Sequence, residues 1–226
     1  MKIFLFWNRI DSDSKKIYSF LEDQCFQEEI AKTHSLILHK PYAKFQISEE
    51  MKAQILESDL VLFFTHGEED VILKSRYKQT QMKKQFSFID SDNAQLLSDK
   101  KVIAICCSSA KELGQLCVDS SIHSKFYIGF QEPITYDDGD HKRVRGLIYT
   151  SYSDAFKEAL LYALTTNCTA QEFVLKLQKS ISDMLIRKIL SETDNHVLGS
   201  LATVRFHHTS AASLVALGDA TLPVFT

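Results

Sequence analysis

Two short apolar runs, each ending in chemically reactive side chains, constrain the fold of this sequence more than any other feature. Val102 to Ile105 is too short for a helix and rich in β-branched residues, which is typical of a fully buried strand, and it leads into Cys106-Cys107. Leu60 to Phe64 has the same character and leads into Thr65-His66-Gly67. Because open α/β sheets place their ligand crevice at the carboxyl ends of parallel strands, a histidine and a cysteine are expected at one edge of a sheet.

Further strand-like runs alternate with helix-like segments along the chain. This alternation predicts an α/β fold in which a mainly parallel central sheet carries helices on both faces. The predicted strands are Lys2 to Trp7, Ser35 to Leu38, Leu60 to Phe64, Val102 to Ile105 and Phe126 to Phe130. One predicted helix follows the caps Asp11 to Ser14, and a second, Glu49 to Glu57, follows the cap Ser48. A short helix or turn is expected at Asn93 to Ser98.

The last third of the chain is predicted to hold two longer helices and a terminal hairpin. The first helix covers Ser153 to Thr165. The second begins at the capping box Thr169 to Glu172 and carries a stripe of apolar residues four apart. The tail from Ala202 to Val224 is expected to form the hairpin.

A basic segment lies between the two reactive motifs. Val71 to Gln85 contains five lysine and arginine residues and no acidic residue. Runs of charge usually face water, so a solvated loop or hairpin is the expected structure here. A docking surface for an acidic partner is the alternative.

Composition limits the class of protein. The 226 residues are 45% apolar and 24% charged, which fits one globular domain over residues 1–226. A net charge of −3 gives no reason to expect direct binding to nucleic acid, and no apolar run is long enough to suggest a membrane span. The five cysteines lack the spacing of a disulfide framework and no signal peptide is recognised, so a cytoplasmic location is expected.

The two adjacent cysteines are expected to differ in role. Neighbouring side chains on a strand point to opposite faces, so one thiol can pack inward while the next emerges at the rim. Cys107 is followed by the small residues 108–110, which leave room for a substrate and are expected to start a helix whose amino end favours a thiolate. Cys107 is therefore the predicted nucleophile and Cys106 the predicted core residue, with Cys106 kept as the alternative nucleophile.

These motifs resemble those of the caspase-like cysteine peptidases of clan CD, most closely the bacterial CHAT-type and gingipain-like catalytic domains. In caspases the histidine precedes the cysteine by about 50 residues, and here His66 lies 41 positions before Cys107. Cys107-x-Ser109-Ala110 is similar to the Cys-x-Ser-Gly of the CHAT type, with alanine in place of glycine. The ending Gly218 to Pro223 is similar to that of gingipain-like domains. The resemblance covers roughly residues 1–223 and implies a caspase-like three-layer α/β/α sandwich.

The same resemblance implies a cysteine endopeptidase that cleaves a specific protein substrate. Cys107 would attack the peptide carbonyl as a thiolate, and His66 would act as general base and then as general acid. The backbone amides of Gly67 and Cys107 would form the oxyanion hole. The family implies no cofactor and no metal ion, and its bacterial members often act in antiviral defence or cell death after activation by a protein partner.

Cleavage specificity is not predicted. Arginine-specific relatives often carry an aspartate two positions before the cysteine, where this chain has Ile105. Seven charged residues that follow predicted strands are candidates for a specificity pocket, and simple surface solvation is the alternative for each of them: Arg9, Asp11, Asp13, Glu132, Asp137, Asp138 and Asp140.

A second class of function competes with peptidase activity. In a non-catalytic caspase-like module, or in a flavodoxin-like binding domain, His66 and both cysteines would only be packing residues. Catalysis would instead need the imidazole and a thiol to meet in an open crevice. The sequence offers no zinc-ligand spacing, no Gly-rich phosphate loop and no Gly-x-Ser-x-Gly motif that would favour another chemistry.

Overall fold

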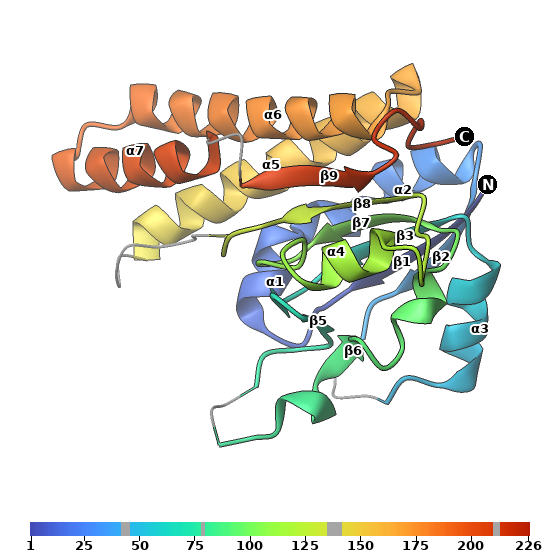
Figure 1. Ribbon diagram of the computed structural model, residues 1–226. Helices are drawn as coiled ribbons and strands as arrows, with labels where there is room; N and C mark the ends of the chain where they lie inside the picture. Colours follow the sequence, from blue (N-terminus) through green and yellow to red (C-terminus); the bar gives the residue numbers. More distant parts are fainter. Residues whose placement is uncertain (42–45, 78–79, 135–141, 210–212) are drawn as a thin grey trace.

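A six-stranded sheet runs through the protein and follows from the apolar runs of the sequence. The computed structural model describes residues 1–41, 46–77, 80–134, 142–209 and 213–226. Within these residues the strand order is β2-β1-β3-β7-β8-β9, with the first five strands parallel and β9 antiparallel to β8 (Figure 1). The strands are β1 (Lys2–Trp7), β2 (Ser35–His39), β3 (Leu60–Phe64), β7 (Lys101–Ile105), β8 (Phe126–Phe130) and β9 (Leu214–Gly218).

Helices cover both faces of this sheet, which confirms the predicted three-layer α/β/α sandwich. One face, which carries Leu5 of β1, packs against α1 (Ser12–Ile17), α2 (Gln24–Ala31), α5 (Lys142–Thr166) and α6 (Ala170–Ser191), and α7 (Asn195–Thr209) lies on α6. The other face, which carries Phe4, packs against α3 (Glu49–Glu57) and α4 (Leu113–Val118). No helix in the described residues is both long and apolar enough to cross a membrane.

The continuous apolar character of the central strands reflects burial on both sides. All five residues of β3 are buried, with Leu60, Leu62 and Phe64 in one core and Val61 and Phe63 in the other. Strands covered on both faces carry apolar residues at every position rather than at alternate ones. This is why the central strands could be recognised from very short runs.

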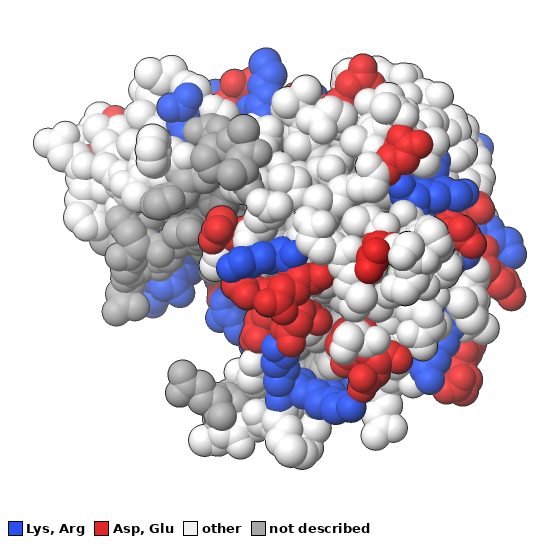
Figure 2. Space-filling view, in the orientation of Figure 1, with Lys and Arg blue, Asp and Glu red and all other residues white. Residues whose placement is uncertain are grey.

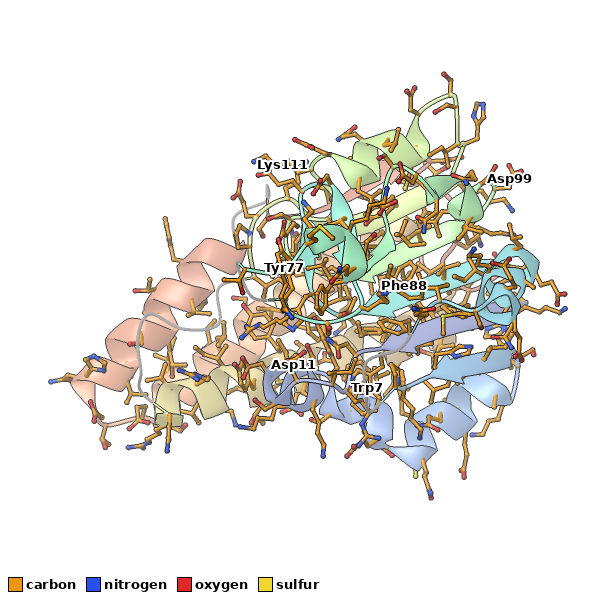
Figure 3. The ribbon with its side chains drawn as sticks, turned by 90° about the horizontal axis from the view of Figure 1, so that it is seen from below. Trp7, Asp11, Tyr77, Phe88, Asp99 and Lys111 are labelled. Atoms are coloured by element: carbon orange, nitrogen blue, oxygen red, sulfur yellow. The ribbon has the colours of Figure 1, made fainter. Side chains whose placement is uncertain are left out.

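The segment between β3 and β7 forms a small antiparallel sheet rather than an irregular loop. It consists of β4 (Gly67–Glu68), β5 (Val71–Leu73) and β6 (Ser87–Ile89). Phe88, labelled in Figure 3, packs edge-on against Phe6 and Phe63 with ring centroids 4.5 and 5.4 Å apart. The small sheet is therefore anchored on the central sheet by its apolar residues.

Three basic side chains of this segment form ion pairs within the molecule. Lys83 lies 3.0 Å from the Glu68 carboxylate, and Lys84 lies 2.6 Å from that of Asp92. Figure 2 shows acidic and basic side chains set against one another on the face of the molecule that it displays. Arg76 likewise pairs with Asp13, so these three cations are neutralised by carboxylates, in agreement with the hairpin expected for the segment.

The helix after the cysteines begins later than expected. Residues 108–112 form turns, with Ser108 at a left-handed φ of 52°, and α4 starts only at Leu113. The backbone N–H of Ser108 donates to the Glu132 carbonyl at 3.2 Å and that of Ala110 to the Phe130 carbonyl at 2.9 Å. The left-handed backbone of Ser108 interrupts a right-handed helix at this position, and the two bonds tie the turn to the end of the neighbouring strand. The expected support of a Cys107 thiolate by a helix amino end was therefore wrong.

The tail also differs from the predicted hairpin. Ala202 to Phe206 lie within α7, whose buried residues Val197, Leu201 and Val204 recur at helical spacing. β9 pairs with β8 instead of with a second tail strand. In addition, α5 begins at Lys142, eleven residues before the predicted Ser153, and so extends much further than its apolar stripe suggested.

Tyr18 holds the ends of β3 and β7 together from the helical layer. This buried residue follows α1, and its hydroxyl donates to the Ile105 carbonyl at 2.8 Å and lies 3.4 Å from the Thr65 carbonyl. Ile105 is the last residue of β7 and Thr65 is the first residue after β3. Because one hydroxyl contacts both, it fixes the level at which the two segments leave the sheet. The fold thus fixes the starting points of the two reactive motifs.

We expect Tyr18→Phe to lower the free energy of unfolding by roughly 1–3 kcal/mol, because the substitution leaves buried carbonyl oxygens without their donor. Urea denaturation followed by circular dichroism measures the change. Tyr162→Phe is the matched control, because its hydroxyl makes no hydrogen bond within the described residues, and it should be nearly neutral. Equal stability of Tyr18→Phe and the parent protein would contradict this role.

Candidate functional site

The two reactive motifs leave adjacent strands at the same level of the sheet. β3 and β7 are parallel neighbours, and Phe64 is paired with Ile105 in their register. His66 and Cys107 each lie two residues beyond this pair. The predicted meeting of a His-Gly segment and a Cys-Cys segment at one edge therefore follows from the strand pairing.

Gly67 brings the two segments into direct contact. A Cβ atom added at this position would lie 2.8 Å from Cys106 Cβ and 2.8 Å from the Cys107 carbonyl oxygen. Such distances are shorter than side chains tolerate, so only glycine fits between these backbones. The glycine after His66 is required for close packing against the cysteine turn.

The adjacent cysteines have different environments. Cys106 is fully buried among apolar residues, its Sγ lies 3.9 Å from the Phe63 carbonyl, and burial raises the pKa of its thiol well above the usual range. Cys107 is half-buried and packs toward the opposite core, on the side of α5. The structure thus confirms Cys106 as a core residue and gives Cys107 the more accessible thiol.

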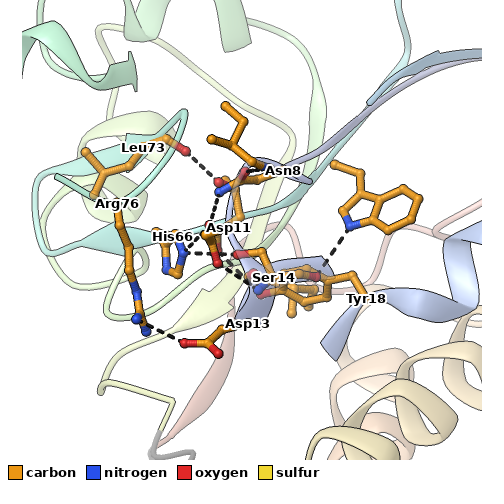
Figure 4. A network of polar contacts seen from close by, with 12 residues as sticks. Asn8, Asp11, Asp13, Ser14, Tyr18, His66, Leu73 and Arg76 are labelled. Atoms are coloured by element: carbon orange, nitrogen blue, oxygen red, sulfur yellow. Dashed lines mark hydrogen bonds and ion pairs between the residues drawn. The ribbon is translucent and has the colours of Figure 1, made fainter. Parts of the chain in front are cut away.

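His66 is held by residues that follow β1. Its Nε2 lies 2.9 Å from Asp11 Oδ2 and 3.0 Å from Ser14 Oγ (Figure 4). Asn8 Nδ2 donates to the same Asp11 oxygen at 2.8 Å. Among the described residues, no hydrogen bond reaches the other ring nitrogen, Nδ1. The imidazole is therefore anchored through one nitrogen and can use the other for proton transfer.

Asp11 is the residue of the site whose role the sequence did not reveal. It was expected to cap a helix or to contribute to specificity, and it does cap α1, because Oδ1 accepts a hydrogen bond from the Ser14 amide at 2.9 Å. Its second oxygen faces His66. Burial alone would raise the pKa of Asp11, but hydrogen bonds with His66 and Ser14 and the charge of His66 hold this pKa well below its ordinary value of 3.8.

The other candidate specificity residues mostly face partners within the chain. Arg9 pairs with Glu22 and stacks over the Trp7 ring, with its guanidinium carbon 4.7 Å from the ring centroid. Asp13 lies 3.0 Å from Arg76 Nη1, and it also bonds with Tyr149 of α5.

The structure does not assign the remaining acidic candidates to the site. Glu132 contributes its carbonyl to the cysteine turn, and Asp137, Asp138 and Asp140 lie outside the described residues. No group of three or more His, Cys, Asp or Glu side chains in the described part of the chain is placed to hold a metal ion.

Comparison with known proteins supports the fold but does not identify the chemistry of the site. No family model and no curated protein matches the sequence. A solved structure described as a protease superposes on 98% of this chain with a TM-score of 0.59 and 12% sequence identity. The match covers 48% of that protein, so this chain spans about half its length. A likeness at this level of identity shows a shared fold.

We expect Asp11→Asn to reduce stability in a pH-dependent way. Asparagine can still cap α1, so the change mainly removes the carboxylate charge beside His66. Because the pKa of Asp11 is lower in the folded than in the unfolded protein, its ionised form stabilises the fold above about pH 4. That contribution is lost progressively as the pH falls further.

Urea unfolding at pH 7 and at pH 3 measures this effect. The gap in unfolding free energy between parent and Asp11→Asn should be larger at pH 7. Asp154→Asn, at an exposed carboxylate with no ion-pair partner among the described residues, serves as control. A gap that stays constant or widens at pH 3 would rule out the proposed interaction.

Gly67→Ala should destabilise the protein by roughly 1–3 kcal/mol, the usual effect of overpacking. The added methyl group meets both the Cys106 side chain and the Cys107 carbonyl, each at 2.8 Å. Gly146→Ala in α5 is the control, because a Cβ there meets no atom within 4 Å and alanine favours the helix. Chemical denaturation of both variants compares them, and a Gly67→Ala protein as stable as Gly146→Ala would contradict the close contact.

Proposed function

We propose that this chain is a cysteine endopeptidase in which His66 and Cys107 form the catalytic dyad. The observation that carries the proposal is the contact at Gly67, which joins the His-Gly segment to the Cys-Cys segment at the carboxyl edge of the sheet. The shared fold with a solved protease is consistent with this chemistry. Cys107 is preferred over Cys106 because a fully buried thiol with a raised pKa is a poor nucleophile.

In the proposed reaction, His66 Nδ1 takes the proton from the Cys107 thiol. The thiolate attacks the carbonyl carbon of the scissile peptide bond, and the protonated imidazole then delivers the proton to the departing amine. The thioester that remains is hydrolysed by a water molecule that His66 deprotonates. The backbone amides of Gly67 and Cys107 are the proposed donors to the oxyanion, and one such donor contributes about 2.7–4 kcal/mol in other enzymes.

Asp11 completes this proposal as the residue that orients His66. Its carboxylate binds Nε2, which fixes the ring so that Nδ1 is directed away from α1. A negative charge beside the ring also stabilises the imidazolium that forms during proton transfer. Asp11 is itself fixed by Asn8 and by the Ser14 amide, so its position does not depend on His66 alone.

The wider biological role follows from the resemblance of the motifs to caspase-like peptidases of clan CD. We propose that residues 1–226 act as one caspase-like peptidase domain of the CHAT or gingipain-like type. Its substrate would be a specific protein, and a protein partner would activate it in a bacterial antiviral defence or cell-death system. The competing role is a non-catalytic interaction module.

Alkylation kinetics test the dyad without a known substrate. Cys25 is an exposed free thiol and provides an internal reference in the same molecule. We expect iodoacetamide to modify Cys107 faster than Cys25 at pH 7, because His66 promotes the thiolate, and we expect His66→Ala to remove this advantage. Peptide mass spectrometry over time measures both rates. A Cys107 rate that is no higher than that of Cys25, or unaffected by His66→Ala, would favour the non-catalytic module.

Cleavage itself is tested by co-expression with the proteins of neighbouring genes, followed by sequencing of new amino termini. Cys107→Ala should abolish cleavage, and His66→Ala should reduce it by roughly 10²–10⁴-fold. Cys106→Ala should retain cleavage despite some loss of stability. Cleavage that survives Cys107→Ala but not Cys106→Ala would transfer the nucleophile to position 106.

A further inference from the structure

A large cleft lies between α1 and α5, beside the candidate site. Its volume is about 750 Å³, within the range of about 300–1,000 Å³ that is usual for ligand pockets. One wall is formed by α1 and the turn after it, and the other by the first three turns of α5. Figure 1 shows α1 beneath the rising amino-terminal part of α5.

Among the described residues that line this cleft, cations outnumber carboxylates. Four cations line it: Lys15, Lys16, Lys142 and Arg145. Two of its three carboxylates already have cationic partners, because Asp13 pairs with Arg76 and Glu22 pairs with Arg9. Among the described residues, four cations and three carboxylates therefore line the cleft. Within the described residues Lys15, Lys16 and Lys142 have no carboxylate partner of their own.

The cleft shares α1 with the surroundings of His66 and α5 with the core beside Cys107. Along α1, Asp11 and Ser14 face His66, whereas Asp13 and Lys15 line the cleft. On the opposite wall, Tyr149 bonds with Asp13. One turn further along α5, burial and the charge of Cys107 raise the pKa of Tyr152. The cleft and His66 thus lie against different sides of α1, and α5 contributes Tyr149 to the cleft and Tyr152 to the core beside Cys107.

We propose that this cleft binds an acidic segment of a polypeptide and so positions a protein substrate next to Cys107. This assignment rests on the proposed peptidase function. Lysine side chains on two separate helices match carboxylates spaced along an extended chain. A compact phosphate group is usually held by backbone amides of a Gly-rich loop or by bidentate arginines, and the cleft has only Gly146, within a helix, and a single arginine.

The full-length Cys107→Ala protein is suitable for a binding test, because it cannot turn over a bound peptide. The probes are three fluorescein-labelled nonapeptides in which Glu and Asp, Gln and Asn, or Lys alternate with Gly and Ser. In fluorescence anisotropy at low salt, we expect the acidic peptide to bind at least tenfold more tightly than the amide peptide. Its affinity should fall as salt rises, because exposed charges are screened. Equal affinities for the acidic and amide peptides would overturn the proposal.

Charge reversal locates the binding site. Lys15→Glu with Lys16→Glu should weaken acidic-peptide binding at least tenfold. Arg187→Glu with Lys188→Glu on α6 changes the net charge equally outside the cleft and should leave affinity within twofold. A similar loss in both double variants would contradict a specific site. Lys142→Glu, a single change on the opposite wall, should also weaken binding and serves as the test if the α1 variant fails to fold.

Two further comparisons separate the possible outcomes. Displacement of the acidic peptide by micromolar pyrophosphate or ATP would assign the cleft to a phosphate ligand and overturn the polypeptide assignment. Acidic-peptide binding that persists while the chain proves non-catalytic would overturn the peptidase function and leave the acidic-segment site standing. Cleavage unaffected by Lys15→Glu with Lys16→Glu would show that the cleft does not position the substrate.

Discussion

The parallel pairing of β3 with β7 is the interaction on which the rest of the site depends. It sets Phe64 opposite Ile105, so His66 and Cys107 each lie two residues beyond the paired ends of the strands. Tyr18 fixes the same level from the helical layer, and Gly67 allows the two backbones to touch. Three separate parts of the sequence thus converge on one geometric requirement, namely that the two motifs end side by side.

The alternation of side chains along β7 separates two thiols that are neighbours in sequence. Cys106 completes the core that contains Phe63, whereas Cys107 turns to the face covered by α5. A pair of adjacent cysteines therefore divides into a packing residue and an accessible one, because each belongs to a different layer of the sandwich. The same helical layer that covers Cys107 also supplies the walls of the basic cleft.

Sequence reasoning succeeded where burial on both faces of the sheet left an unmistakable run of apolar residues. The central strands, the cap at Ser48 and the capping box at Thr169 were all correct for local reasons. It failed where distant partners decide the structure. The turn at residues 108–112 depends on carbonyls at the end of β8, and the contact of Asp11 with His66 depends on β1 lying beside β3. Neither partnership leaves a pattern in the local sequence.

The brevity of α1 has a consequence for the dynamics of the site. A helix of six residues lacks the length to persist by itself in water, so α1 depends on its cap at Asp11 and on the burial of Ile17. Asp11 and Ser14, which contact His66, therefore share this short element with one wall of the cleft, and the order of both depends on how α1 packs. A change that disorders α1 would therefore disturb the contacts of the imidazole and one wall of the cleft together.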